Sequence, residues 1–378
     1  QDSSFAGAKT AQGNQDGNSI GDFYYTPPTG FLALCTSNLP DVAVVPSEHF
    51  NTVLYTGNAT ARSITGVGFQ PDFVWNKTRS ASQNHFLYDA VRGASKDLRS
   101  NQTNAEGTSD AVTAFNSDGF SVGSGNDGNE NSQTYVNWNW KANGSGSSNT
   151  NGSINSTVSA NVDAGFSIVS YTGDGGTATV GHGLSSAPEM IILKTRDTDQ
   201  FWVVYHANNT ANPETDYLRL NGTNATTDDT YWDDTAPTNA LFSLRSGAAV
   251  NKLNDKFIAY CFHSVDGYSK VGSYVGNSNV DGTFVYTGHR PSLILLKRTD
   301  SADPWVIFDS AREPENEDDG QDLSLKANAS DAEAAYGNID LLSNGFKVRI
   351  NAGYMNNNNS PYVYLCFSET PFKYSNAR

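Results

Sequence analysis

Hydrophobic residues in this chain fall in short runs that polar residues and turn formers separate. The runs are rich in Val, Ile, Tyr, Phe and Trp, which is typical of β-strands joined by turns. In the run YVNWNW at 135–140, asparagines alternate with tryptophans, which predicts a strand with one apolar face. The run LILL at 293–296 is apolar throughout, which predicts a strand covered on both faces. Helical periodicity is nearly absent, and DAEAAY at 331–336 predicts one helical turn or a short helix.

Five short motifs recur three times in the same order, which indicates an internal repeat. In each copy a proline opens an apolar run that ends six residues later at a lysine, namely Lys77, Lys194 or Lys297. A second run, HFLYD, WVVYH or WVIFD, starts eight residues after the lysine. Upstream lie LYTGN, SYTGD and SYVGN; downstream lie GFSV, LFSL and GFKV, then YVNWNW, FIAYCF and YVYLCF. The lysines are either charged strand ends or members of three equivalent sites.

The repeat predicts an all-β chain of three tandem homologous β-sandwich units, jelly-roll-like, at 50–142, 164–264 and 268–378. The segment 1–49 is too short to bury a core of its own, so we expect it to dock on the first unit or to be the remnant of an upstream domain. The stretch 143–163 is rich in Gly, Ser and Asn and predicts a flexible linker. The second and third units have a short connection, so we expect them to pack together, with the first unit more independent.

Charge narrows the range of partners. The 378 residues include 40 acidic and 24 basic side chains, for a net charge of −16, which argues against a nucleic acid or an anionic membrane as partner. No apolar run approaches the length of a membrane helix, so we expect no membrane insertion. The three cysteines, Cys35, Cys261 and Cys366, have no spacing typical of disulfide frameworks or zinc sites, and we interpret them as small buried hydrophobes.

Catalytic motifs are not recognisable in the sequence. The six histidines lie outside any known catalytic motif, and we therefore predict that the chain is not an enzyme. Two acidic loops, 227–234 and 313–320, leave three alternatives open: a solvated surface, a calcium site, or the carboxylate pair of a glycoside hydrolase. For a metal, which would be calcium, the candidate ligands are Asp127, Asp318 and Asp319.

The loop TDDTYWDD is the best candidate for ligand binding. Its two rings could stack on a sugar while the flanking carboxylates accept hydrogen bonds from sugar hydroxyls. The alternative is that the rings fold the loop onto the sandwich and the carboxylates are merely solvated. The candidate residues are Asp228, Asp229, Tyr231, Trp232, Asp233 and Asp234.

Several long strings resemble the C-terminal repeat region of virion-associated proteins from marine tailed phages, which are labelled tail-fibre or structural proteins. The strings are TPPTGFLALCTSNLP, SITGVGFQPDFVWNKTRS, YTGHRPSLILLKRTDS and YVYLCFSETPFKYSNAR. The N-terminal piece also resembles the last strands of a SPRY-like, concanavalin-type sandwich. The second unit departs from the pattern, because HANN replaces the DAVR and DSAR of the other two units.

The resemblance implies a virion-surface, extracellular structural protein with a role in adhesion. The implied partners are a host-surface glycan or receptor, other virion proteins, and further copies of the chain in a homo-oligomer. Two rival hypotheses remain open: an architectural filament or shell subunit without a ligand, and a polysaccharide-degrading fibre enzyme.

Overall fold

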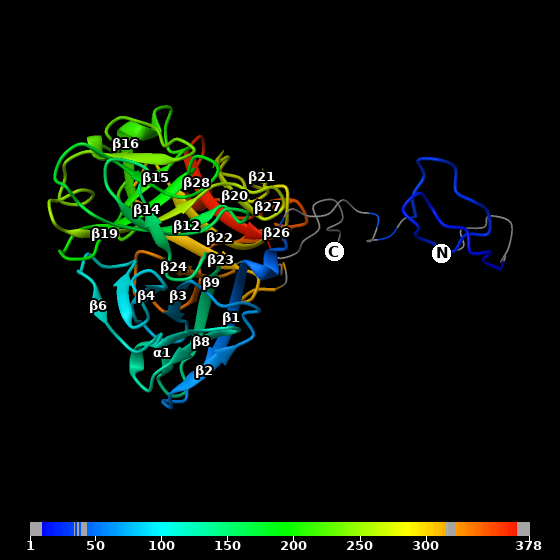
Figure 1. Cartoon of the computed structure of the whole chain (residues 1–378), viewed down its shortest axis with the longest axis horizontal. Helices are drawn as coiled ribbons and strands as arrows, with labels where there is room; N and C mark the ends of the chain where they lie inside the picture. Colours follow the sequence, from blue (N-terminus) through cyan, green and yellow to red (C-terminus); the bar gives the residue numbers. More distant parts are fainter. Residues whose placement is uncertain are drawn as a thin grey trace. The chain divides into compact units, whose positions relative to one another are not determined.

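The structure, a computed structural model, describes residues 10–33, 35, 38, 44–314, 316 and 322–368. The chain divides into a short N-terminal part, Gln1–Ala43, and a main body, Val44–Arg378 (Figure 1). In the N-terminal part, Asn14 and Phe23 form an antiparallel bridge, and the Asp16 carboxylate accepts a hydrogen bond from the Ala33 N–H at 2.7 Å. The predicted role of residues 1–49, as a docking segment or a domain remnant, stays a prediction.

Repeat one holds a large and a small antiparallel sheet. The large sheet has the order β1 (Phe50–Thr56), β9 (Thr134–Trp140), β3 (Phe73–Thr78), β4 (His85–Asp89), β5 (Lys96–Arg99), β6 (Gly107–Thr108). The small sheet has the order β2 (Arg62–Thr65), β8 (Gly119–Val122), β7 (Ala114–Asn116). A 3₁₀ turn, η2 (Pro46–Glu48), precedes β1, and one helical turn, α1 (Asn126–Asn129), precedes β9.

Repeat two has the same plan, with two strands added to its large sheet and one strand fewer in its small sheet. Its large sheet has the order β10 (Ser147–Asn149), β11 (Ser156–Asn161), β12 (Phe166–Thr172), β19 (Lys256–Phe262), β14 (Met190–Thr195), β15 (Val203–His206), β16 (Asp216–Arg219), β17 (Thr227–Asp228). The small sheet pairs β13 (Ala178–Gly181) with β18 (Leu241–Leu244). Two 3₁₀ turns, η3 (Pro213–Thr215) and η4 (Thr230–Trp232), lie in the loops beside β16.

Repeat three returns to the plan of repeat one. Its large sheet has the order β20 (Ser269–Val275), β28 (Pro361–Ser368), β22 (Pro291–Arg298), β23 (Trp305–Asp309), β24 (Leu323–Lys326), β25 (Ala334–Ala335). Its small sheet has the order β21 (Phe284–Tyr286), β27 (Gly345–Val348), β26 (Ile339–Leu342), and α2 (Gly353–Asn356) precedes β28. The sequence 331–336 carries β25, so the helical turn predicted there is wrong.

The register of the strands makes the three repeats equivalent, as predicted. Lys77, Lys194 and Lys297 each pair with the residue that follows the aromatic at the start of the closing strand. Those aromatics stack in the same way on the tyrosine of the upstream motif, with ring centroids 4.8 to 5.1 Å apart: Tyr135 on Tyr55, Phe257 on Tyr171 and Tyr362 on Tyr274. The chain is therefore all-β, and three copies of one strand plan build the main body.

Each repeat is layered because its two sheets share apolar side chains. In repeat one, Val74 and Tyr88 of the large sheet pack in one buried cluster with Ile64 and Phe120 of the small sheet. Repeats two and three have corresponding clusters of their own. The apolar faces that alternate along the strands are thus buried between layers, as the sequence pattern indicates.

The stretch 143–163 is not a linker. Its strands β10 and β11 add to the edge of repeat two's sheet, with β11 antiparallel to β12 from Ser156↔Tyr171 to Asn161↔Phe166. Between them, Ile154 bridges Val180 of β13. A polar Ser/Thr/Asn segment becomes a strand here because it satisfies the free edge of β12. We call residues 147–161 the edge strap of repeat two.

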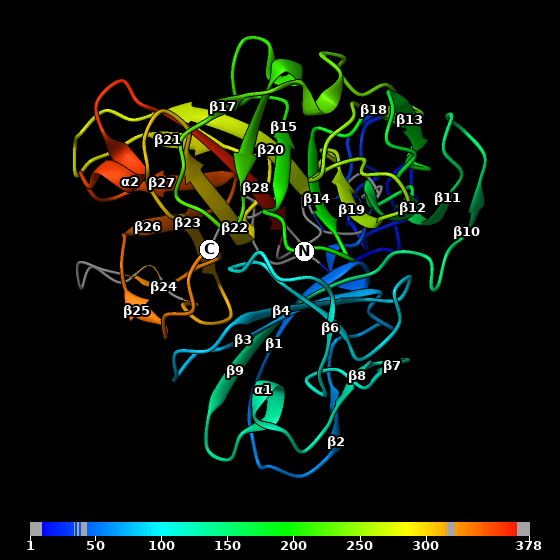
Figure 2. The same ribbon diagram turned by 90° about the vertical axis from the view of Figure 1, so that its left-hand side faces the viewer.

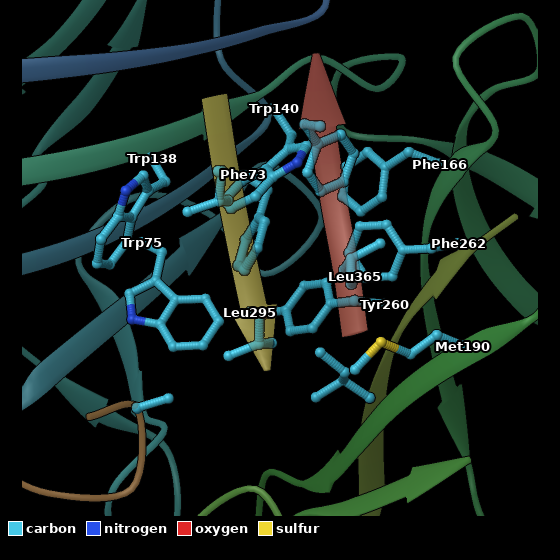
Figure 3. Close-up of a cluster of buried hydrophobic side chains, with 14 of the residues drawn as sticks. Phe73, Trp75, Trp138, Trp140, Phe166, Met190, Tyr260, Phe262, Leu295 and Leu365 are labelled. Carbon is cyan, nitrogen blue, oxygen red and sulfur yellow. The ribbon is translucent and has the colours of Figure 1, made fainter. Parts of the chain in front are cut away.

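A further buried core, which we call the common core, contains side chains from all three repeats. Phe73 of repeat one lies 4.3 Å from Tyr260 and 6.0 Å from Phe166 of repeat two, measured between ring centroids, and Figure 3 shows these rings together. Phe50 of repeat one stacks on Phe367 of repeat three at 5.0 Å. Figure 2 shows the repeats as three lobes around this centre. The expectation that the first unit is more independent is therefore wrong, because its large sheet faces the common core.

Candidate functional site

The predicted ligand loop is closed onto repeat two. Trp232 in η4 is 1 % exposed, and its ring lies 5.6 Å from the Tyr205 ring in a T-shaped contact. Tyr231 packs in the same way 5.0 Å from Tyr217. The Trp232 ring therefore has no face for a sugar, and the alternative interpretation, a loop folded onto its sandwich, describes the geometry.

The four carboxylates of this loop have separate surroundings. Asp229 caps η4 by accepting a hydrogen bond from the Thr230 N–H at 2.7 Å. Asp233 has a left-handed backbone, with φ of 52°, and its carboxylate lies 3.6 Å from Arg245. Asp228 and Asp234 are exposed. Their positions serve the turn, and they do not converge on one point.

Of the candidate metal ligands, Asp127 alone lies within the described residues. Asp127 is half-buried in α1, and burial, with Asp97 and Asp110 nearby, raises the pKa of its carboxyl. Asp318 and Asp319 lie outside the described residues. Within the part of the chain that the structure describes, no three His, Cys, Asp or Glu side chains are grouped closely enough to hold a metal ion.

The three repeat lysines are buried and bind backbone carbonyls. Lys77 Nζ donates to the Ser330 carbonyl of repeat three at 3.2 Å, and Lys297 Nζ donates to the Thr223 carbonyl of repeat two at 3.2 Å. Lys194 Nζ binds two carbonyls of its own repeat at 2.8 and 3.4 Å. Burial lowers the pKa of all three ammonium groups to about 8. These geometries assign the lysines to contacts within and between repeats.

A buried ion pair closes the second strand run in repeats one and three. Asp89 and Arg92 are 2.5 Å apart, as are Asp309 and Arg312, and all four side chains are inaccessible to solvent. Each arginine also donates to a backbone carbonyl of the preceding strand, at 2.8 and 3.0 Å. The D-x-x-R motif therefore stabilises the fold at the end of this strand.

The same aspartates receive a hydrogen bond from another repeat. The Tyr260 hydroxyl of repeat two donates to Asp89 at 2.8 Å, and the Trp138 indole N–H of repeat one donates to Asp309 at 3.0 Å. Tyr260 and Trp138 occupy the same position of the closing strand in their repeats. The contact between two repeats, which we call a seam, is thus specified by a buried acceptor and a donor.

The seam between repeats two and three lacks both parts of this motif. His206 stands where the other repeats have aspartate, and Leu365 of repeat three stands where the donor would be. The His206 Nδ1 accepts the Asn208 N–H, so Nε2 carries the proton and donates to the Tyr364 carbonyl of repeat three at 3.2 Å. The loss of the aspartate in repeat two is therefore accompanied by the loss of the donor in repeat three, on the other side of the seam.

Two further ion pairs cross the seams. Glu106 of repeat one binds Arg196 of repeat two, with N–O distances of 2.8 and 3.0 Å. Glu333 of repeat three binds Arg79 of repeat one at 2.8 to 3.1 Å. Each of these largely buried charges thus has a partner of opposite sign, as folding requires of buried charges.

The exposed candidate is an apolar patch on repeat three. Val275, Val280, Phe284 and Tyr286 are 55 %, 61 %, 44 % and 67 % exposed. The hydroxyl of Thr283, which precedes Phe284, donates to the Val275 carbonyl at 2.8 Å, so the start of β21 lies beside the end of β20. They lie on β20 and β21, the edge strands of their two sheets, and in the loop between them. We call these four residues the edge patch.

The edge patch is specific to repeat three. At the positions of Val275, Phe284 and Tyr286, strand register places Thr56, Ser63 and Thr65 in repeat one, and Thr172, Thr179 and Gly181 in repeat two. In repeat two the corresponding edges are also covered by the edge strap. Aligning the solvent-facing positions of the three repeats would reveal this patch from the sequence. The acidic loops gave no indication of it.

Comparison with known proteins places the main body in one family. A family model described as a domain of unknown function (DUF7483) matches residues 45–371. The chain belongs to this family. The match begins next to Val44, where the main body begins, so the family's domain contains all three repeats. No curated protein matches the chain.

Within the described residues, no helix has the length and apolar character needed to cross a membrane.

Proposed function

We propose that this chain is a virion-surface structural protein that mediates adhesion to a host surface, with a glycan as the contacted group. The observation that carries the proposal is the edge patch, because exposed apolar side chains gathered on two edge strands and the loop between them are typical of an interaction site. Two of its members are aromatic, and aromatic rings stack well on the apolar faces of sugars. The resemblance of the sequence to phage virion proteins supports the place of action.

The geometry of the main body also favours a scaffold over a catalytic centre. Its buried aspartates, lysines and histidines hold seams and strand ends. Rigid β-layers with exposed edges are suited to presenting a contact surface. The net charge of −16 suits a neutral partner better than an anionic one.

The test uses the residues that repeat one carries at the same positions. In the full chain, Phe284→Ser with Tyr286→Thr converts the patch to the polar surface of repeat one. We expect attachment to host cells, or binding to a glycan array, to fall at least about ten-fold. The melting temperature should hardly change, because both side chains are exposed.

The matched control is Leu253→Ser, which removes an apolar side chain that is 60 % exposed on repeat two. This variant should attach like the unmodified chain. Attachment that is equal in all three proteins would overturn the proposal that the edge patch makes the contact. Release of reducing sugar from host envelope would instead favour the enzyme hypothesis.

A further inference from the structure

A cavity of about 220 Å³ lies at the seam between repeats three and one. Its lining comes from the start of β1 and the turn before it, the start of β22, the turn after β23 and the end of β28. The lining residues are Ser47, Phe50, Asn51, Thr52, Ser292, Ser310, Ala311 and Ser368. We call this space the seam cavity.

The seam cavity exists because three positions carry smaller residues than their counterparts. Ser292 corresponds to Asp72 and Glu189, since in each case the residue's carbonyl accepts the N–H of the residue after the second strand run, at 2.7 to 2.9 Å. Ala311 corresponds in the same way to Val91 of repeat one.

Thr52 of β1 makes the third difference. Thr52 pairs with Trp138 of the closing strand. In the other two repeats the residues at the position of Trp138 are Tyr260 and Leu365, and they pair with Ile168 and Val271. Thr52 therefore corresponds to Ile168 and Val271. Ile168 and Val271 belong to the buried common core, whereas Thr52 lies on the wall of the cavity. Replacing Ile or Val by Thr leaves less apolar volume and adds a hydroxyl.

The described lining residues are mostly polar, and none carries a charge. Five hydroxyl side chains and one amide line the cavity, beside the Phe50 ring, and none of these described lining residues is ionisable.

We propose that the seam cavity binds one neutral monosaccharide unit, a hexose, of a surface glycan. The inference rests on the proposed function and names the sugar class and a site for it. A volume of about 220 Å³ exceeds several times that of one water, about 30 Å³, and lies below that of pockets for drug-sized ligands, about 300 Å³ and above. Hydroxyls and an amide match the donors and acceptors of a sugar ring.

The described lining residues carry no charge, which favours a neutral sugar. An acidic sugar would need a cation to offset its desolvation, and the lining supplies hydroxyls and an amide instead. The amide of Asn51 already donates to the Gly66 and Val67 carbonyls, at 3.3 and 3.0 Å, which leaves its oxygen to accept a sugar hydroxyl.

The test fills the cavity with residues from the other repeats. The variant Thr52→Ile with Ala311→Val introduces the side chains of Ile168 and Val91, and the matched control Thr56→Ile makes the same change on the exposed end of β1. Methyl glycosides of glucose, galactose and mannose, with N-acetylneuraminic acid as the acidic counterpart, are titrated against each full-length protein by saturation-transfer NMR.

We expect at least one neutral glycoside to bind the unmodified chain and the control, and to lose ten-fold or more in affinity with the filled variant. The melting temperature of that variant should be unchanged or higher. Absence of neutral-sugar binding, preference for the acidic sugar, or undiminished binding by the filled variant would each overturn the inference, water being the occupant in the first case.

Hydrogen exchange on the unmodified chain gives a second readout that does not depend on a variant. The bound sugar should slow exchange in 47–52 and 310–311 and leave 62–65 unchanged; protection elsewhere alone would place the sugar at another site. If the filled variant loses sugar binding but attaches to the host normally, the cavity binds sugar without a role in adhesion. If attachment needs the edge patch but no sugar binds in the cavity, the proposed function holds and the sugar site does not.

Discussion

At the residue scale, several titratable side chains are buried in their neutral form. His182, His206 and His289 are nearly inaccessible, and burial lowers their pKa from 6.5 to about 4. His182 repeats the arrangement of His206, because its Nδ1 accepts the Leu184 N–H and its Nε2 donates to the Thr238 carbonyl. A neutral ring that donates from one nitrogen and accepts at the other suits a site between backbone groups.

These histidines predict acid destabilisation below neutral pH. Unfolding restores the pKa to about 6.5, so between pH 6.5 and about 4 the unfolded chain binds more protons than the folded chain. The free energy of unfolding therefore falls as the pH falls through this window, by up to about 3 kcal/mol for each histidine. Urea denaturation at several pH values measures the slope.

The variant His206→Asn should flatten this slope by about one proton, since one titrating group is gone. A stability that does not change between pH 7 and 4.5 would contradict the prediction.

At the scale of elements, sequence patterns located the strands that face a core and failed where a neighbour decides the structure. The repeat lysines and the closing strands were predicted because the apolar positions around them are fixed by burial on both faces. The strand β11 was missed because Ser, Thr and Asn pair with the free edge of β12 without a hydrophobic pattern of their own. The sequence leaves two alternatives open for the loop of Trp232 for a related reason, since burial of its ring depends on Tyr205, a partner distant in sequence.

The edge strap makes a prediction at the same scale. Gly152 has φ of +91°, and a Cβ there would lie 2.5 Å from the Thr179 carbonyl oxygen. The variant Gly152→Ala should therefore lose about 1–3 kcal/mol of stability, through backbone strain and displacement of the strap from β13. Urea denaturation measures the loss, and limited proteolysis should then cut within 147–161 first.

Gly144→Ala is the matched control, because Gly144 also has a positive φ, +64°, but nothing lies within 4 Å of the added Cβ. Its cost should be limited to the backbone term, about 1 kcal/mol. Equal costs for the two variants would show that the contact with β13 does not hold the strap.

At the scale of the whole molecule, the three repeats close into a ring of seams. One backbone hydrogen bond recurs at each seam, from an N–H in the loop after β5, β16 or β24 to a carbonyl at the end of the first strand run of another repeat. The bonds are Glu106 to Arg196, Thr226 to Thr299 and Glu333 to Arg79, at 2.7, 2.8 and 2.7 Å. Because the same order of repeats holds at all three seams, the sequence repeat becomes a closed arrangement around the common core.

This closure could not be read from the sequence. The motifs predict what each repeat buries within itself, whereas the seams depend on which side chains meet across repeats. Trp138 and Asp309, for example, are 171 positions apart and meet in a buried hydrogen bond. At the seam of repeats two and three, both the aspartate and the hydrogen-bond donor are missing. These two changes can be related to each other only once the contact between the two repeats is known.

The common core predicts that the main body unfolds as one unit. Trp305 of repeat three is buried in that core, and its indole N–H donates to the Arg219 carbonyl of repeat two at 2.8 Å. The variant Trp305→Ala should cost about 3–5 kcal/mol, because it leaves a large cavity and an unpaired carbonyl. Since repeats one and two contribute side chains to the same core, they should lose stability together with repeat three. Differential scanning calorimetry should show one transition of the main body moving to lower temperature.

The control is Tyr286→Ala, which removes an exposed aromatic side chain in the same repeat and should shift the transition little. A transition that splits, with one part unmoved, would show that the repeats unfold separately and that the shared core does not couple them.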